Sequence, residues 1–261
     1  MGFTQKGEPT IWADEVRILA KAVAPPPEKW HGLTDKEARY RRRYVDLWAS
    51  DGVQEVFVKR SKTLSAMRSY LEEEGYLEVE THILHPIAGG AAARPFVTHH
   101  NDLDADLYLR IAPELYLKRL IVGGMERVFE FARNFRNEGV SYRHNPEFTM
   151  LELYEAQADY LRMMDVTEQL IERAALAVNG TTRIEFRGEA YDLKAPFERV
   201  RYTELFRQHV GAEFDDETAV RAVAKDLGIE EHAGYWKLMG DVFRLEERRV
   251  GKEGRSRWSP D

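Results

Sequence analysis

The chain has 261 residues, which allows one large domain or two small ones, and 43% of its residues are hydrophobic, enough for a sizeable core. It contains no cysteine, which excludes disulfides and thiolate metal sites and is compatible with a reducing compartment. The formal net charge of -7 argues against a general nucleic-acid-binding protein, because phosphate contacts need clustered Lys and Arg. The sequence predicts neither a membrane span, which needs roughly 20 apolar residues, nor a signal peptide.

The N-terminal segment predicts little structure that could fold by itself. Residues 1–24 contain two short candidate strands, at 10–12 and 16–19, which bury little apolar surface alone. Three consecutive prolines then begin a stiff linker, residues 25–50.

A capped short helix and a long helix follow. Thr34 or Asp35 is placed to cap a short helix inside the linker. Apolar residues at helical spacing predict a long helix over residues 51–74, and Gly75 is a plausible residue to end it. The segment YLEVETHIL, residues 76–84, predicts a strand.

The most informative stretch combines two strands and a loop. In VFEFARNFRNE, alternation places Arg136 and Glu138 on one face and phenylalanines on the other. In FTMLELYEA, Glu152 and Tyr154 share one face and leucines take the other. Residues 139–146 between them are rich in turn formers, so an antiparallel hairpin is predicted. Its charged face suits a ligand that carries both phosphate and ammonium groups.

The remaining elements are predicted by the same patterns. Apolar periodicity predicts a helix over residues 161–178. Residues 182–193 predict a hairpin around a central glycine, and residues 203–209 and 218–227 predict short helices. Residues 246–261, mixed in charge and poor in apolar side chains, predict a disordered tail.

The hairpin resembles motif 2 of the class II aminoacyl-tRNA synthetases, an F-R-x-E strand followed by a loop and a return strand. Three segments, FRNEG, RHNPEFTMLELYEA and LYLRIAPELYLKRLIVGG, are similar to the bacterial lysyl-tRNA synthetases, and the similarity runs from about residue 7 to about residue 245. The resemblance implies an α/β (α+β) fold of the class II catalytic type, a largely antiparallel sheet flanked by helices, here incomplete.

The resemblance also implies a domain division. Residues 1–24 resemble the last hairpin of an anticodon-binding OB-fold, and residues 51–245 a partial catalytic domain that holds motifs 1 and 2. After about Leu245 the similarity stops. Residues 246–261 resemble a translated sequencing adapter, so we expect an artefact appended to a truncated gene; the alternative is a genuine divergent basic tail.

Motif 1 is assigned to the helix at 51–74 and the strand after it. In the family this motif forms the interface of a homodimer, so a homodimer is expected here. The family usually has a proline directly after the Glu-Thr pair, where this chain has His82. We therefore expect the end of that strand to be locally altered.

The implied activity is lysine–tRNA ligation in the cytoplasm: lysine and ATP give lysyl-adenylate, and the lysyl group passes to tRNA(Lys). The sequence after Gly180 contains no match to motif 3, the motif that supplies the Mg²⁺ ligands in the family. We expect this chain to hold roughly half an active site and to be inactive alone, while it still binds ATP weakly.

The resemblance assigns the ATP-binding residues to motif 2. Arg136 is the expected catalytic residue, because a guanidinium can bridge the carboxylate of the amino acid and the α-phosphate. Glu138 is assigned to the adenine amino group, His144 to the outer phosphates and Asn145 to the neighbourhood of ATP. Phe148 is expected to stack on adenine.

The lysine-binding residues are assigned in the same way. Lysine is cationic at both ends, so its pocket needs carboxylates and an aromatic or hydroxyl partner. Glu114 is the expected ligand of the α-ammonium, and Glu152 and Tyr154 are expected to line the side-chain pocket. Gly90 leaves room for the substrate, and Arg136 meets its carboxylate.

The sequence leaves alternatives open for two basic segments and for the origin of the chain. The basic run RYRRR, residues 39–43, is either a solvated helix face or a tRNA contact, and Arg143 is either an ATP-side or a tRNA-facing residue. The chain could also derive from a paralogue that attaches lysine to a protein, which the OB-fold remnant disfavours. A third possibility is a non-catalytic interaction module made from a truncated synthetase.

Overall fold

A computed structural model of the chain describes residues 2–21, 23–25, 27, 32–139, 141, 144–186, 188–229 and 234–256, with side chains up to residue 245. The chain forms two compact units, Met1–Ala195 and Pro196–Asp261. The boundary between them falls inside the 51–245 segment that was expected to be one domain. Among the described residues, no helix is both long enough and apolar enough to cross a membrane.

The N-terminal segment forms one very small hairpin. β1 (Gly2–Phe3) pairs antiparallel with β2 (Pro9–Thr10). The strand predicted at residues 16–19 is not formed, and Val16 and Leu19 are exposed. A strand needs a neighbour that takes up its backbone hydrogen bonds, and no described segment pairs with this one.

Two short helices occupy part of the predicted linker. α1 (Lys36–Arg41) begins at Asp35, whose carboxylate accepts a hydrogen bond from the backbone N–H of Ala38, as predicted. α2 (Arg43–Ala49) follows directly. Residues 26 and 28–31 of the linker lie outside the described residues.

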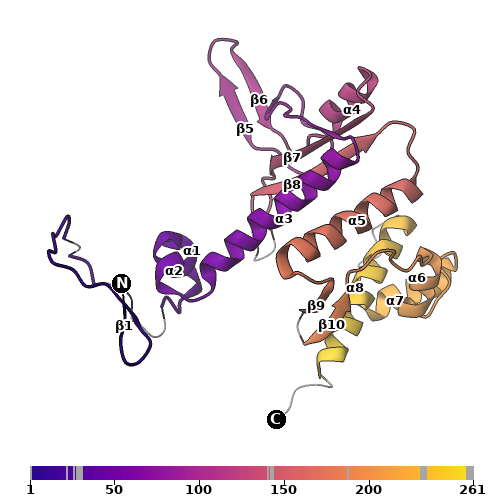
Figure 1. Cartoon of the computed structure of the whole chain (residues 1–261). Coiled ribbons are helices and arrows are strands. Elements are labelled where there is room, and N and C mark those ends of the chain that lie inside the picture. Colours follow the sequence, from indigo (N-terminus) through magenta and orange to yellow (C-terminus); the bar gives the residue numbers. More distant parts are fainter. Residues whose placement is uncertain are drawn as a thin grey trace. The chain divides into compact units, whose positions relative to one another are not determined.

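Two long helices and a sheet enclose the core of the first unit. α3 (Val53–Glu73) and α5 (Tyr160–Asn179) run side by side, as Figure 1 shows, and both confirm the helices predicted there. Gly75 follows α3 with a positive φ of 81°, which explains why a glycine stands at that turn. The core cluster is Tyr70, Leu71, Tyr76, Phe129, Val166 and Leu170.

Besides the β1–β2 hairpin, the described strands of this unit form two three-stranded sheets and a second hairpin. One sheet has the order β3 (Leu77–Glu78), β7 (Arg127–Phe135), β8 (Glu147–Glu155), with β3 parallel and β8 antiparallel to β7. The other has the order β4 (Leu84–His85), β6 (Ala105–Leu109), β5 (Val97–His100), and is antiparallel throughout. β9 (Arg183–Phe186) and β10 (Glu189–Asp192) form the hairpin predicted at residues 182–193. These mixed sheets and helices confirm the α+β class.

The strand predicted at residues 76–84 is divided between the two sheets. Its first part is β3 and its end joins β4, with non-strand residues between them. Thr81 lies in the crossing segment, where its hydroxyl donates to Glu130 of β7 at 2.7 Å. The backbone N–H of Arg110 donates to the carbonyl of Ile83, which fixes the chain to the second sheet. Polar contacts with distant strands thus interrupt the strand that local sequence favours.

The second unit is a small helical cluster. It contains α6 (Tyr202–Val210), α7 (Glu217–Asp226) and α8 (Tyr235–Ser256), of which the first two were predicted. Asp216 caps α7. The buried side chains are Phe206, Val210, Val220, Ala224, Leu238 and Val242. Because α8 continues to Ser256, most of the segment expected to be disordered, 246–261, is helical here, and residues 257–261 lie outside the described residues.

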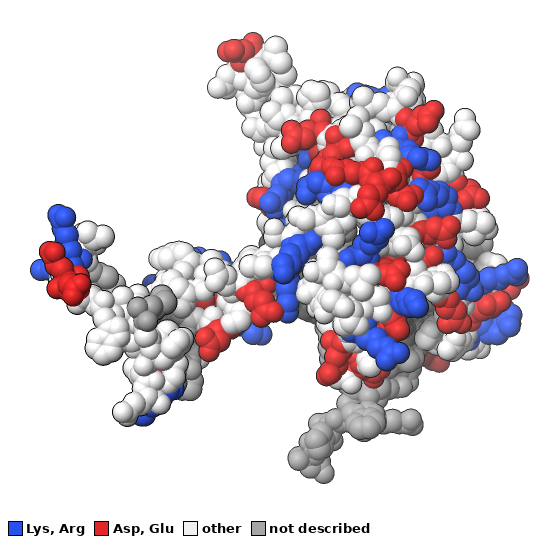
Figure 2. Space-filling model, in the orientation of Figure 1, with Lys and Arg blue, Asp and Glu red and all other residues white. Residues whose placement is uncertain are grey.

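The charged side chains are mixed in sign over the surface. On the face drawn in Figure 2, Lys and Arg alternate with Asp and Glu, and acidic side chains gather at its upper end. In the basic run 39–43, Arg39 and Arg43 both bind the buried carboxylate of Asp46, and Arg41 pairs with Glu37. Much of the charge of this run is therefore neutralised within α1 and α2.

Candidate active site

The hairpin of β7 and β8 has the two faces that the sequence predicts. Phe129 pairs with Leu153, and Phe131 with Leu151, and these side chains join the core under the sheet. The opposite face carries the polar residues, since side chains alternate along a strand. Continuing the same register puts Arg136 opposite Pro146, whose carbonyl accepts a hydrogen bond from the Arg136 N–H at 2.8 Å.

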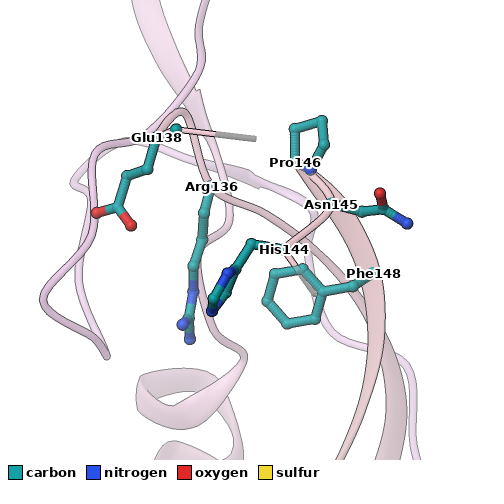
Figure 3. Close-up of a pocket in the computed structure, with 7 residues that line it drawn as sticks. Arg136, Glu138, His144, Asn145, Pro146 and Phe148 are labelled. Carbon is teal, nitrogen blue, oxygen red and sulfur yellow. The ribbon is translucent and has the colours of Figure 1, made fainter. Parts of the chain in front are cut away.

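A cavity of about 420 Å³ lies at the end of this hairpin. It is lined by all five residues that were predicted to bind ATP, together with a glycine and a proline: Arg136, Glu138, Gly139, His144, Asn145, Pro146 and Phe148. In Figure 3 the guanidinium, the imidazole of His144 and the ring of Phe148 gather at one side, while the side chains of Glu138 and Asn145 point away from them. The structure therefore brings the predicted set to one place.

The Arg136 guanidinium is available for an anion. Its carbon lies 5.1 Å from the centre of the Phe148 ring, a cation–π contact. Its Nε is buried without a hydrogen-bond partner, and no carboxylate of the described residues forms an ion pair with it. A buried guanidinium nitrogen without an acceptor is costly, so an anionic ligand would be bound favourably here.

The remaining cavity residues are held by local contacts. The Glu138 carboxylate accepts a hydrogen bond from the backbone N–H of Arg94 at 3.3 Å, which ties it to the loop that follows Gly90. His144 lies 2.7 Å from the hydroxyl of Ser141 through its Nδ1. Arg143, for which two roles were open, lies outside the described residues.

The residues predicted to bind lysine form a second group on the hairpin. The hydroxyl of Tyr154 donates to the carboxylate of Glu152 at 3.2 Å. Burial raises the pKa of Glu152, and the nearby carboxylates of Glu114 and Glu130 raise that pKa further. Burial and the carboxylates of Glu152 and Glu114 raise the pKa of the Tyr154 hydroxyl far above its usual value. The carboxylates of Glu152, Glu114 and Glu130 thus lie close to one another and to the tyrosine, an arrangement that would favour a cationic ligand.

Glu114 and Gly90 complete this second group. Glu114 is the first residue of α4 (Glu114–Val122), and it forms an ion pair of 2.6 Å with Lys118 on the next turn. Gly90 has a φ of 89° and lies so close that an added Cβ would come within 3.2 Å of the Cβ atoms of Ala112 and Glu114. A larger residue would be strained there and would press on Glu114.

A buried polar network that the sequence did not predict lies next to this group. Arg110 and Glu130 form an ion pair of 2.6 Å, with side chains 4% and 5% exposed. Arg110 also donates to the carbonyl of Arg133 and to Thr81. Glu130 is the register partner of Glu152, so strand alternation alone could have placed it on the site face.

Asn134 was also missed. It is fully buried on the same strand, between Glu130 and Arg136, and neither of its side-chain polar atoms has a hydrogen-bond partner. Alternation puts it on the site face as well. The described residues contain no group of three His, Cys, Asp or Glu side chains arranged to hold a metal ion.

The two groups therefore offer complementary chemistry. One group presents an aromatic ring and an arginine, which suit a flat base and a phosphate or carboxylate. The other presents carboxylates and a tyrosine, which suit an ammonium group. Phe148 of the first group and Glu152 and Tyr154 of the second share the charged face of one hairpin, so two joined or reacting ligands could span the two groups.

Comparison with known proteins identifies the family. Residues 35–237 match the family model for class II tRNA synthetases (D, K and N). The chain is 54% identical over 245 residues to a lysine–tRNA ligase of Carboxydothermus hydrogenoformans, covering 92% of this chain and 50% of that protein. It is 56% identical over 246 residues to a lysine–tRNA ligase of Syntrophomonas wolfei, with the same coverage. The chain spans about half the length of these relatives. It belongs to the class II tRNA synthetases of the D, K and N group.

Proposed function

We propose that the chain is the ATP- and lysine-holding part of a lysine–tRNA ligase. The activity would be the ATP-dependent activation of lysine to lysyl-adenylate, followed by transfer of the lysyl group to tRNA(Lys). The identity of 52–56% to relatives named lysine–tRNA ligase, from several bacteria, supports this proposal.

The choice of lysine within the family rests on one observation. Aspartate, asparagine and lysine differ in side-chain charge, and only lysine carries an additional cation. In this chain the Tyr154 hydroxyl donates to Glu152, and the carboxylate of Glu114 lies close enough to raise the pKa values of both groups. Such a pocket would repel the carboxylate of aspartate and would leave the amide of asparagine without a matching charge.

The proposed chemistry is the attack of a lysine carboxylate oxygen on the α-phosphorus of ATP, with pyrophosphate leaving. No proton needs to move in this step, so positioning and charge neutralisation are sufficient. Arg136 would bridge the carboxylate and the α-phosphate, and Phe148 would stack on adenine. Glu138 would accept from the adenine amino group, and His144 would contact the outer phosphates.

The partners expected for this function are a second copy of the chain and tRNA(Lys). Val56 and Phe57 are exposed on α3, the helix assigned to motif 1, which is consistent with a homodimer interface there. tRNA(Lys) would be the second substrate, and the cytoplasm would be the place of action. Magnesium is expected for the complete family active site.

Titration calorimetry with lysine, aspartate and asparagine, each with ATP present, tests the proposed specificity. We expect lysine to bind best and Glu152→Gln to abolish that preference. Glu147→Gln is the matched control, because Glu147 is in the same strand on the other face and should leave lysine binding unchanged. Equal affinity for aspartate and lysine would contradict the proposal.

A further inference from the structure

An ammonium group of the chain itself already lies at the predicted lysine pocket. The Nζ of Lys118 is 2.6 Å from a carboxylate oxygen of Glu114. The same Nζ lies 5.9 Å from the centre of the Tyr154 ring. Lys118 thus contacts an acidic and an aromatic member of the group that was assigned to substrate lysine, although the sequence analysis gave it no role.

The electrostatics of the pocket explain why a cation is held there. Glu114 and Glu152 raise the pKa of Tyr154, and Glu114 raises the pKa of Glu152, so their charges interact. Without a counter-ion these carboxylates would repel one another. The ammonium of Lys118 neutralises Glu114 in this structure.

The contact of Lys118 is easily reversed. Its side chain is 54% exposed, and that of Glu114 is 32% exposed. A flexible Lys side chain at this exposure can move its ammonium into water at small cost. The position is therefore suited to an exchange in which another ammonium takes over the carboxylate.

We propose that Lys118 is an intramolecular competitor of the substrate: its ammonium occupies the carboxylate of Glu114 and must leave before the α-ammonium of the amino acid binds. The inference rests on the proposed function, because it uses the lysine pocket defined there. It assigns to Lys118 a specificity role. A ligand must supply an ammonium that outcompetes Lys118, which disfavours ligands that lack one at that end.

The size of the effect follows from the exposure of the pair. Exposed Glu–Lys pairs four residues apart in a helix shift an equilibrium by about twofold, and a partly exposed cation–π contact adds a similar factor. Apparent affinity scales with the fraction of molecules in which the site is free. We therefore expect Lys118→Gln to tighten lysine binding by about two- to fivefold.

The test compares four chains by titration calorimetry or ligand-observed NMR with L-lysine: wild type, Lys118→Gln, Lys118→Arg and Lys59→Gln. The arginine variant keeps the cation and should retain wild-type affinity. Lys59→Gln is the matched control, because Lys59 pairs with Glu55 at 2.7 Å in the same i,i+4 geometry on α3. Circular dichroism melting of each variant checks that the fold is intact.

A second ligand shows where the competition occurs. Nα-acetyl-lysine lacks the α-ammonium, so its affinity should be the same for Lys118→Gln as for the wild type. An equal gain for both ligands would mean a general charge effect and would overturn the assignment to Glu114.

The remaining outcomes separate the inference from the proposed function. Lysine selectivity in the wild type with unchanged or weaker binding in Lys118→Gln overturns the inference alone, and weaker binding would make Lys118 a residue that holds Glu114 in place. Lysine binding that appears only in Lys118→Gln supports both. Absence of lysine binding in every chain, with the fold intact, overturns both.

Discussion

Replacing Arg110 by methionine removes the centre of the buried network under the predicted lysine pocket. The guanidinium donates at 2.6 Å to Glu130, at 2.9 Å to the carbonyl of Arg133 and at 3.1 Å to the hydroxyl of Thr81. Thr81 in turn donates to the second carboxylate oxygen of Glu130. Arg110→Met leaves that carboxylate buried without its counter-charge.

The expected cost is large because both partners are almost fully buried. With side chains 4% and 5% exposed, removal of one partner should lower the free energy of unfolding by about 3–5 kcal/mol. The ion pair of Arg68 and Glu78 provides the control, since it has the same chemistry but side chains 37% and 33% exposed. Arg68→Met should cost no more than about 1 kcal/mol.

Hydrogen–deuterium exchange of peptides from β7 and β8, combined with urea titration followed by circular dichroism, measures the loss in the unit that holds the network. The double variant Arg110→Met with Glu130→Leu should recover most of the loss, because it removes the stranded charge as well. Equal losses of about 1 kcal/mol or less in Arg110→Met and Arg68→Met would refute the reasoning.

Three further predictions concern ligand binding and pH. Phe148→Ala should weaken ATP binding at least about fivefold, by loss of stacking, and leave the binding of inorganic tripolyphosphate unchanged in the same fluorescence titration. Because burial raises the pKa of Glu152 above its ordinary 4.5, its charge is lost at a higher pH than that of a free carboxylate. Lysine affinity should therefore fall as pH is lowered toward that raised pKa; Glu152→Gln should show no such fall, and an identical pH profile in both chains would exclude Glu152. Burial lowers the pKa of His85 below its ordinary 6.5. As pH falls, His85 is therefore protonated in the unfolded chain at a higher pH than in the folded chain. Stability to urea should fall between pH 7.5 and 5.5, less steeply in His85→Gln, and equal slopes would count against this role.

The sequence determined the elements whose side chains follow a strict period. The faces of the β7–β8 hairpin, with Phe129 and Leu153 inward and Glu152 and Tyr154 on the other side, match the structure because alternation along a strand is a local property. The long helix α3 and its glycine stop follow from helical spacing and backbone freedom in the same way. The predicted ATP-binding residues lie together because motif 2 is nearly continuous in sequence.

The tertiary structure decided what depends on partners far apart in the chain. The strand predicted at residues 76–84 is divided because Thr81 binds Glu130, 49 residues later. Residues 16–19 were predicted to form a strand, but no described segment pairs with them, so they form none. The tail predicted at 246–261 to be disordered continues α8 as far as Ser256.

The site likewise combines residues that the sequence predicted with contacts that only the tertiary structure set. Sequence placed Glu114 and Tyr154 among the candidates, but it gave no sign that Lys118 would contact both of them. The burial of Arg110 against Glu130 also arises only when β6 and β7 are brought together. An ion pair stabilises or destabilises the fold according to its burial and the distance between its charges. Both quantities are set by packing rather than by sequence spacing.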